Sequence, residues 1–523
     1  MIGAMNSTAR KIALVVALGT LMVMFDVTVT AIAIPTLTTT FGTTLSTVQW
    51  VTTGYTLALV AVMPTSAWLV SRFGDKRTYL TALALFVGGS VMAGLAWNIG
   101  SLVAFRALQG LGGGLLAPVG MTIVIRSAEV AHRGRAMAVL GLPLFIGPVL
   151  GPTLGGVIVD SVGWRVLFLI NLPIGMIAIA LAALLFPRSE TGVRTGLDWR
   201  GLLTLPPGAV LVVAGLSRLG ETGDVADPIG LVSTALGITL ILRFALRAQR
   251  VSIPLLNTRL LRRRPMWSAL ATLAPFTAAY FGSMIALPIY VQQVRGDSAT
   301  IAGMLTIAQA LVSAVTLQIA TRLVDRIDPR RIALVGISSA LAGYVAVAAC
   351  IATNAPYPLL ATVSILIGIG AGATMMPLMT ASTRNLPDTD VPSGSTLLNT
   401  NSQLFSAMGA AALATTLSIT SPTSAPTGHW VALAYLVPIS LVSIALVVAA
   451  TALPRDIKNL SDRCDAHFPE KRCAAKHLHV VQVSRPAPRR YSPVTRSAYR
   501  SESYYRTSTA RLRNAVRGGR LAE

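Results

Sequence analysis

The chain has 523 residues, of which 53% are hydrophobic and only 12% are charged. This composition excludes a soluble globular protein of this length and indicates a protein that crosses a membrane many times. The formal net charge of +23 would suit nucleic acid. However, the basic residues gather in the C-terminal tail and in alternate loops between apolar runs, which is a pattern of membrane topology.

Apolar runs of about 20 residues, each long enough to cross a bilayer as a helix, recur along the chain. The first run is too long for a cleaved leader and carries an acid, so we expect a retained helix. We predict an all-α polytopic membrane protein with fourteen transmembrane helices, over residues 12–35, 48–70, 79–97, 101–125, 136–159, 165–187, 201–218, 229–246, 267–291, 301–321, 332–353, 358–380, 397–420 and 430–453.

The charges of the loops predict the orientation. If the N-terminus is cytoplasmic, almost all loop arginines and lysines fall on the cytoplasmic side, and only Arg165, Arg218 and Arg295 fall outside. This bias follows the positive-inside rule. We therefore expect a multi-pass protein of the cytoplasmic (inner) membrane with both termini in the cytoplasm, as an even number of spans requires.

A repeated pattern at two helix ends divides the chain. Leu-Val-x-Arg occurs at residues 69–72 and again at 323–326, each time followed by more basic residues. Such a repeat is typical of a two-bundle transporter, although two unrelated basic loops would also satisfy the positive-inside rule. The predicted organisation is a cytoplasmic N-terminus (1–11), a six-helix bundle (12–187), two extra helices with a basic cytoplasmic linker (188–264), a second six-helix bundle (265–454) and a basic, disordered cytoplasmic tail (455–523).

Two charged residues lie deep in apolar runs. Asp26 is the one acid in such a place, where a carboxylate costs about 2.5–3.5 kcal/mol. Because burial disfavours its charged form, it could exchange a proton or pair with a cationic substrate; a structural hydrogen bond between helices is the alternative. Arg106 is the one deep basic residue, with Gln109 on the same helix face. It could control the charge of a nearby acid or extend toward the outer surface.

A bent helix with a bare face is predicted in the run 136–159. Gly147, Gly151 and Gly155 recur every four residues and stack on one face, which lets a neighbouring helix approach closely. Pro148 and Pro152 each remove a backbone donor and bend the helix. This pattern fits either simple close packing or a place where two bundles pack and rock.

A polar patch lies in the run 397–420. It contains Asn399, Asn401 and Gln403, and Asn399 and Gln403 are one helical turn apart. These side chains could line a water-filled substrate cavity or could join neighbouring helices by hydrogen bonds.

Other chemistry is not indicated. The chain has no phosphate-loop motif for ATP, and its apolar runs hold no cluster of His or Cys. We therefore expect no enzyme, no catalytic or metal site and no cofactor. In the tail, Cys464 with His467 and Cys473 with His477 could in principle bind zinc, but their flanks show no fold. The tail's composition predicts disorder and attraction to anionic lipid.

Five segments occur in a characteristic order: the run 18–35 around Asp26, the loop 72–77, the segment 106–110, the Gly-Pro segment 147–156 and the segment 164–175. With these segments the chain, over about residues 10–453, resembles the major facilitator superfamily in its fourteen-helix drug:proton antiporter branch of multidrug efflux permeases. Ser71 departs from the branch, which usually has Asp in this loop, and Ser402 stands where span thirteen often has Arg.

The resemblance implies a six-plus-six helix core with two extra helices, alternating access, and export driven by protons. It implies that Asp26 is a proton or cation site and that Arg106, with Gln109, assists coupling. It implies a hinge and seal at Gly147, Pro148, Gly151, Pro152, Gly155 and Gly156, and cytoplasmic gating loops with Arg72, Gly74, Asp75, Lys76, Arg77, Asp325 and Arg326.

Our first hypothesis is a proton-coupled exporter (antiporter) of amphipathic, lipophilic or cationic drugs. Its partners would be a small-molecule substrate, protons and membrane lipid, but no nucleic acid. The alternative is an exporter of one physiological solute, such as a metabolite, siderophore or lipid precursor. A third hypothesis is a membrane sensor or scaffold that signals through the tail. Competition among unrelated compounds would separate the first two, and deletion of the tail would test the third.

Overall fold

A computed structural model describes residues 7–129, 132–187, 196, 198–222, 224, 226–251, 254–284, 286–297, 299–324, 327–384, 386–420 and 428–454. Several predicted features lie outside the described residues: Asp325 and Arg326, the pairs Cys464–His467 and Cys473–His477, and the basic tail 455–523.

All regular structure within the described residues is helical. The first part of the chain forms α1 (Ser7–Phe41), α2 (Leu45–Val62), η1 (Met63–Thr65), α3 (Ser66–Phe73), α4 (Asp75–Gly94), α5 (Ile99–Ser127), α6 (Arg133–Val162), α7 (Trp164–Leu169), α8 (Asn171–Leu185), α9 (Trp199–Leu202), α10 (Leu205–Thr222) and α11 (Pro228–Ala248). The second part forms η3 (Thr258–Arg262), α12 (Arg264–Ser283), α13 (Ala286–Ile289), η4 (Tyr290–Val294), α14 (Ala299–Leu323), α15 (Pro329–Ala352), α16 (Tyr357–Thr383), α17 (Val391–Thr420), α18 (Gly428–Ala434) and α19 (Leu436–Ala452).

Local sequence explains where several helices begin. The Asn98 side chain accepts a hydrogen bond from the backbone N–H of Ser101 and completes a capping box at the start of α5. The side chains of Asp227 and Asp328 cap α11 and α15 by accepting from the backbone N–H of Gly230 and of Arg330, and each is followed by a proline in the first turn. A proline suits this position because its missing N–H would have no partner there.

The structure confirms an all-helical membrane protein. Eleven helices within the described residues are long and apolar enough to cross a membrane. Each coincides with one of the fourteen predicted spans, and the other three predicted spans fall on α4, α6 and α17. The count of fourteen therefore stays a prediction.

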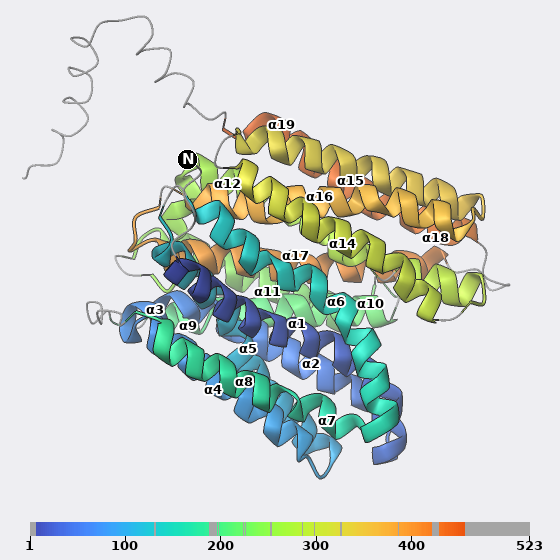
Figure 1. Cartoon of the computed structure of the whole chain (residues 1–523), viewed down its shortest axis with the longest axis horizontal. Coiled ribbons are helices and arrows are strands. Elements are labelled where there is room, and N and C mark those ends of the chain that lie inside the picture. Colours follow the sequence, from blue (N-terminus) through green and yellow to red (C-terminus); the bar gives the residue numbers. More distant parts are fainter. Residues whose placement is uncertain are drawn as a thin grey trace, which may run out of the picture. The chain divides into compact units, whose positions relative to one another are not determined.

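The helices pack in two sets that meet along α6, α10 and α17. In the first set α1 packs on α6 and α5, and α5 packs on α2 and α4. In the second set α16 packs on α14 and α15, and α12 packs on α17 and α19. Figure 1 shows the blue helices α1–α5 on one side and the yellow-to-orange helices α15 and α16 on the other, with the teal α6 beside α14 between them. Between the sets, α6 contacts α14, while α10 contacts both α2 and α17.

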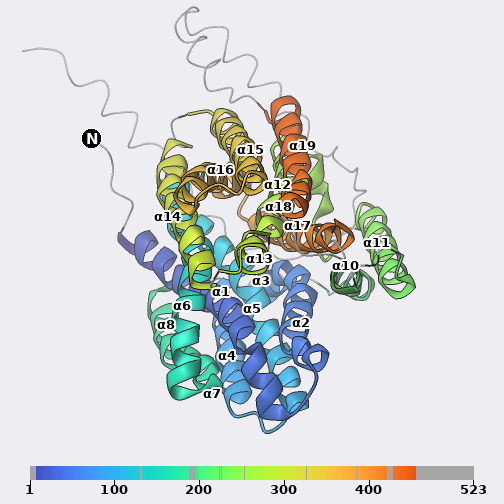
Figure 2. The same ribbon diagram turned by 90° about the vertical axis from the view of Figure 1, so that its right-hand side faces the viewer.

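The helix α11 lies at the periphery. It packs mainly on α10, and Figure 2 shows this pair at one side of the two helix sets. Its Phe244 and Ala248 are buried in a small apolar cluster with Leu205, Leu255 and Leu256. This cluster joins the end of α11 to the start of α10.

Candidate functional site

A buried pair of polar residues on α5 is the base of the site. Of the eleven candidate spans, α5 has the largest buried share, 83% of its most apolar window. Arg106 and Gln109 lie three residues apart on its inner face and are both fully buried. The Arg106 Nη1 atom donates to Gln109 Oε1 at 2.7 Å, so the two side chains support each other. The sequence therefore places them together correctly.

Asp26 of α1 completes this pair. Arg106 Nη1 lies 2.5 Å from Asp26 Oδ2, and Gln109 Nε2 donates to Asp26 Oδ1 at 2.8 Å. The Asp26 residue is only 2% exposed. A buried carboxylate is tolerated when an opposite charge and further hydrogen bonds compensate for the lost water, and both are present here.

Asn171 and Ser90 extend the network to two more helices. Asn171, the first residue of α8, donates its Nδ2 to Asp26 Oδ1 at 3.4 Å and to Ser90 Oγ at 3.0 Å. Ser90 of α4 donates in turn to the Phe168 carbonyl at 2.8 Å. The sequence interpretation did not single out either residue. Asn171 did carry a signal, because it is the lone amide in the apolar segment 164–175; Ser90 carried none.

Aromatic rings enclose the Arg106 guanidinium. Its Cζ lies 4.2 Å from the ring centre of Tyr55 on α2 and 5.4 Å from that of Phe168 on α7, which are distances of cation–π contact. Its Nε donates to the Val51 carbonyl at 3.3 Å. Three polar atoms around this centre are buried and have no hydrogen-bond partner among the residues that the structure describes: Arg106 Nη2, the Tyr55 hydroxyl and Asn171 Oδ1.

This arrangement links one buried acid to side chains of four helices, α1, α4, α5 and α8. Because arginine keeps its proton, only Asp26 in the pair can change charge. A proton on the Asp26 carboxylate would remove the attraction to Arg106 and leave a buried cation uncompensated. Proton binding would therefore favour a rearrangement of the contacts that α1, α4, α5 and α8 make here.

The Gly-Pro segment lies inside α6. The backbone is helical at all six of its named positions: Gly147, Pro148, Gly151, Pro152, Gly155 and Gly156. A Cβ added at Gly147 would lie 2.6 Å from the Met24 Cβ, so the bare face at this point lets α6 approach α1. At the other end of α6, Gln318 of α14 donates to the Ala138 carbonyl at 3.1 Å. The helix thus contacts both sets.

The predicted first gating loop joins three helices. Gly74, with φ +82°, forms the turn between α3 and α4, a conformation that favours glycine. Asp75 binds Arg126 of α5 through two bonds of 2.6 and 2.9 Å. Lys76 donates to the carbonyls of Ala183 and Phe186 at the end of α8. Arg72 is half-buried and Arg77 is exposed.

The two helix sets also contact each other at the end of the protein that holds this loop. We call it the basic end; α3, α5 and α16 end there, and α4, α6 and α17 begin there. Arg126 Nη2 donates to the Asp388 carbonyl at 2.5 Å, and Arg133 Nη1 donates to the Arg384 carbonyl at 2.7 Å. The buried hydroxyls of Ser66 and Thr396 lie 2.6 Å apart. The two helix sets are therefore in direct contact at the basic end.

The side chains of the polar patch on α17 do not all contact the same helix set. Asn399 contacts the Met121 sulfur of α5 at 3.6 Å and so faces the first helix set. Asn401 donates to the Leu270 carbonyl of α12 at 3.4 Å, within its own set. Gln403 is half-buried. The structure does not bring these three residues to Asp26 by any described hydrogen bond.

A polytopic helix bundle with a buried, hydrogen-bonded acid–base pair at the centre of one helix set is the architecture of a membrane transporter. A family model described as Major Facilitator Superfamily matches residues 16–410, about three quarters of the chain. The chain belongs to this family. It is therefore a transporter and not an enzyme.

The relatives fit this assignment. The chain is 38% identical over 403 residues to a Mycobacterium tuberculosis protein named multidrug resistance protein B homolog, covering 77% of this chain and 75% of that protein. It is 30% identical over 398 residues to the uncharacterized MFS-type transporter YhcA of Bacillus subtilis, covering 76% and 74%.

Solved structures share the fold. The proton:xylose symporter XylE, bound to 6-bromo-6-deoxy-D-glucose, matches with a TM-score of 0.61 at 15% identity, covering 86% of this chain and 96% of that one. The human organic anion transporter MFSD10 matches with a TM-score of 0.58 at 15% identity, covering 85% and 99%. At this identity the likeness shows the fold alone.

Proposed function

We propose that this chain is a proton-coupled secondary active exporter, an antiporter that removes amphipathic, lipophilic or cationic compounds. One observation carries the proposal: Asp26 is 2% exposed and is bound by Arg106 and Gln109 in the centre of a helix set. The substrate class is supported by the name of the Mycobacterium tuberculosis relative, a multidrug resistance protein B homolog.

The proton would act on the Asp26–Arg106 pair. In the arrangement described here Asp26 is buried and is held as the partner of a fixed cation. Opening toward the outer side would expose the carboxylate to protons. Protonation would release Arg106, and rearrangement of α1 and α5 would then carry the proton inward while substrate leaves. A cationic substrate could replace the proton as the second partner of the carboxylate.

Alternating access would use the two bundles 12–187 and 265–454, with α10 and α11 as the added pair of a fourteen-span topology. In this proposal the basic end is cytoplasmic, following the positive-inside rule, and both termini lie on that side. The bonds of Arg126, Arg133 and Ser66 across the basic end would hold it closed. The Gly-Pro helix α6, which contacts both sets, would serve as hinge and seal.

The test is proton-driven efflux of ethidium from membrane vesicles. We expect the wild type to pump, a protonophore to stop it, and Asp26→Asn to be inactive at matched expression. Asp227→Asn is the matched control, because it neutralises an acid that pairs with Arg218 at the surface, and it should pump normally. In Asp26→Asn the Arg106 cation is buried without a partner, so this variant could fold poorly. The double variant Asp26→Asn/Arg106→Gln buries no unpaired cation and is then tested in its place.

Two outcomes would change the proposal. Normal, proton-dependent pumping by Asp26→Asn would make Asp26 a structural residue. If the folded wild type moved none of several unrelated dyes, an exporter of one physiological solute would become the better description.

A further inference from the structure

The outer face of α11 is the most exposed of the candidate membrane spans. Only 17% of its most apolar window is buried, the lowest share among the eleven. Its large apolar side chains point away from the protein, including Leu242 at 57% and Leu246 at 67% exposure. In a membrane this face contacts lipid directly.

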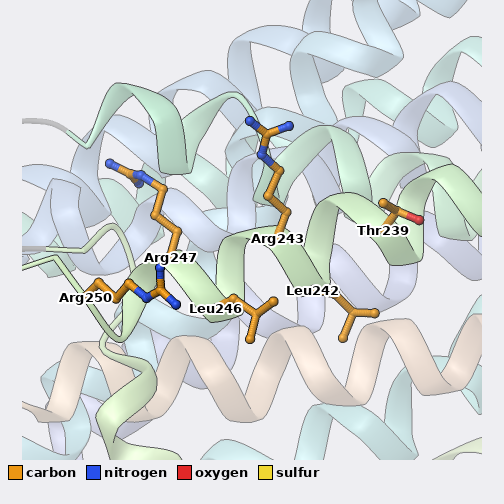
Figure 3. A pocket seen from close by; sticks show the side chains of 6 residues that line it. All are labelled: Thr239, Leu242, Arg243, Leu246, Arg247 and Arg250. Atoms are coloured by element: carbon orange, nitrogen blue, oxygen red, sulfur yellow. The ribbon is translucent and has the colours of Figure 1, made fainter.

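A groove of about 480 Å³ runs along the last three turns of this face, a volume in the range of small-molecule sites, roughly 300–1,000 Å³. Its walls are two neighbouring ridges of side chains at four-residue spacing. They are formed by Thr239, Leu242, Arg243, Leu246, Arg247 and Arg250. Figure 3 shows the two leucines on one side of the helix, Arg243 on the other, and Arg250 beside Leu246.

One of the three arginines is already used. Arg247 Nη1 binds Asp198 Oδ1 at 2.7 Å, and Asp198 also accepts from the backbone N–H groups of Gly201 and Leu255. Burial alone would raise the pKa of the Asp198 carboxyl, but these hydrogen bonds outweigh it and lower the pKa. The acid is therefore charged at neutral pH and balances Arg247.

Arg243 and Arg250 have no acidic partner among the residues that the structure describes, and both are exposed. They are seven residues apart, about 10 Å along the direction of the helix axis. The groove thus carries two uncompensated positive charges next to two exposed leucines. An anionic headgroup would supply the missing charge, and acyl chains would cover the leucines.

We propose that this groove, formed by residues 239–250 at the end of α11, binds an anionic phospholipid of the adjacent leaflet. The phosphate lies between Arg243 and Arg250, and an acyl chain follows Leu246 and Leu242 toward the membrane centre. A free phosphate ion would use the arginines but not the leucines, so the apolar wall favours lipid. The proposal needs α11 to cross the membrane but does not rest on proton coupling or on drug export.

The experiment is native mass spectrometry of the full, delipidated chain in mild detergent, titrated with phosphatidylglycerol, phosphatidylcholine or inorganic phosphate. The test variant is Arg243→Gln/Arg250→Gln. The matched control is Arg10→Gln/Arg322→Gln, which removes two exposed arginines outside the groove. Arg247 is left unchanged because it fixes the end of α11.

We expect the wild type to bind phosphatidylglycerol more tightly than phosphatidylcholine. Each arginine should contribute about one contact to the phosphate. Loss of both contacts in the test variant should weaken binding of the most tightly bound phosphatidylglycerol molecule by about 30-fold. The control should bind as the wild type does, and Leu242→Ser/Leu246→Ser should also bind more weakly. Equal loss in test and control variants would overturn the proposal, as would displacement of the lipid by equimolar inorganic phosphate.

Discussion

Arg106 Nη1 lies 2.5 Å from Asp26 Oδ2, and both side chains are almost completely buried. Each charge is tolerated in the membrane interior because the other is present. Removing one charge alone leaves the other buried without compensation. A proton on Asp26 would have this effect, because arginine keeps its own proton.

A double-mutant cycle should show this dependence. Asp26→Asn and Arg106→Gln, which each leave one charge uncompensated, should each lower the free energy of unfolding by about 3–5 kcal/mol. The double variant should lose clearly less than the sum, because it buries no unpaired charge. Unfolding by denaturant in detergent micelles, at one detergent concentration for all variants, measures the four values.

Additive losses in that cycle would mean that the two charges do not stabilise each other. Ser364→Ala is a suitable control for the assay, because Ser364 is buried in α16 and bonds only to the Leu360 carbonyl of its own helix. It should change the free energy of unfolding much less than either charge variant.

The sequence singled out Asp26 and Arg106 because charged residues in hydrocarbon are rare and costly, and Gln109 because it shares a helix face with Arg106. It could not predict Asn171 and Ser90 as their partners, because uncharged polar residues are common in membrane spans and their contacts depend on how α4 and α8 pack on α1. The all-helical fold followed from the apolar runs alone, as their length and spacing leave few alternatives.

The contacts at the basic end were only partly predictable. The sequence indicated a gating loop with Asp75 and Lys76, and the structure gives each of them a partner on another helix. It did not indicate Arg126, which binds Asp75 and reaches the Asp388 carbonyl 262 residues away. A contact at that separation has no local pattern. The positive-inside rule accounts for the loop arginines as a group, so it did not distinguish the contacts of Arg126 from those of the other arginines.

Replacing Asn171 should slow transport. In Asn171→Leu the Asp26 carboxylate loses an N–H donor, so the hydrogen-bond network between α1 and α8 is weakened. We expect the rate of proton-dependent efflux to fall several-fold at matched expression. Initial rates of ethidium efflux from membrane vesicles measure the change.

An unchanged efflux rate in Asn171→Leu would reject the prediction. Ser90→Ala should produce a smaller loss of rate, because Ser90 contacts the Asn171 amide and not Asp26. Asn399→Leu is the matched control: it removes an amide that bonds to Ser395 and contacts Met121, not Asp26.

A cross-link across the basic end should stop transport. The Ser66 and Thr396 hydroxyls lie 2.6 Å apart on opposite helix sets, so cysteines at these positions should form a disulfide under oxidation. In a chain without Cys350, Cys464 and Cys473, oxidised Ser66→Cys/Thr396→Cys should transport nothing, and a reducing agent should restore efflux. The prediction assumes that the basic end must open in each cycle.

The control pair for this cross-link is Thr44→Cys/Thr47→Cys, whose hydroxyls lie 2.9 Å apart at the start of α2 within one set. Its oxidation should leave efflux intact. Continued efflux by the fully cross-linked Ser66–Thr396 variant, shown by mass spectrometry of the disulfide, would contradict opening at the basic end.

Asp198 should stabilise the junction of α9 and α11 in a pH-dependent way. Its side chain, 3% exposed, accepts from Gly201, Arg247 and Leu255, and these bonds lower the pKa of the carboxyl against the opposing effect of burial. Because the unfolded value is about 3.9, the contribution is fully present above about pH 4 and is lost as the pH falls through the lower folded-state value. Asp198→Asn should therefore lower the free energy of unfolding by about 1–3 kcal/mol at neutral pH and not at all once the wild-type carboxyl is protonated.

Thermal unfolding of both proteins from pH 7 downward measures the difference in stability. The control is Glu129→Gln, at a largely exposed acid, which should match the wild type throughout. A difference that persisted undiminished in acid would show that the charge of Asp198 contributes nothing.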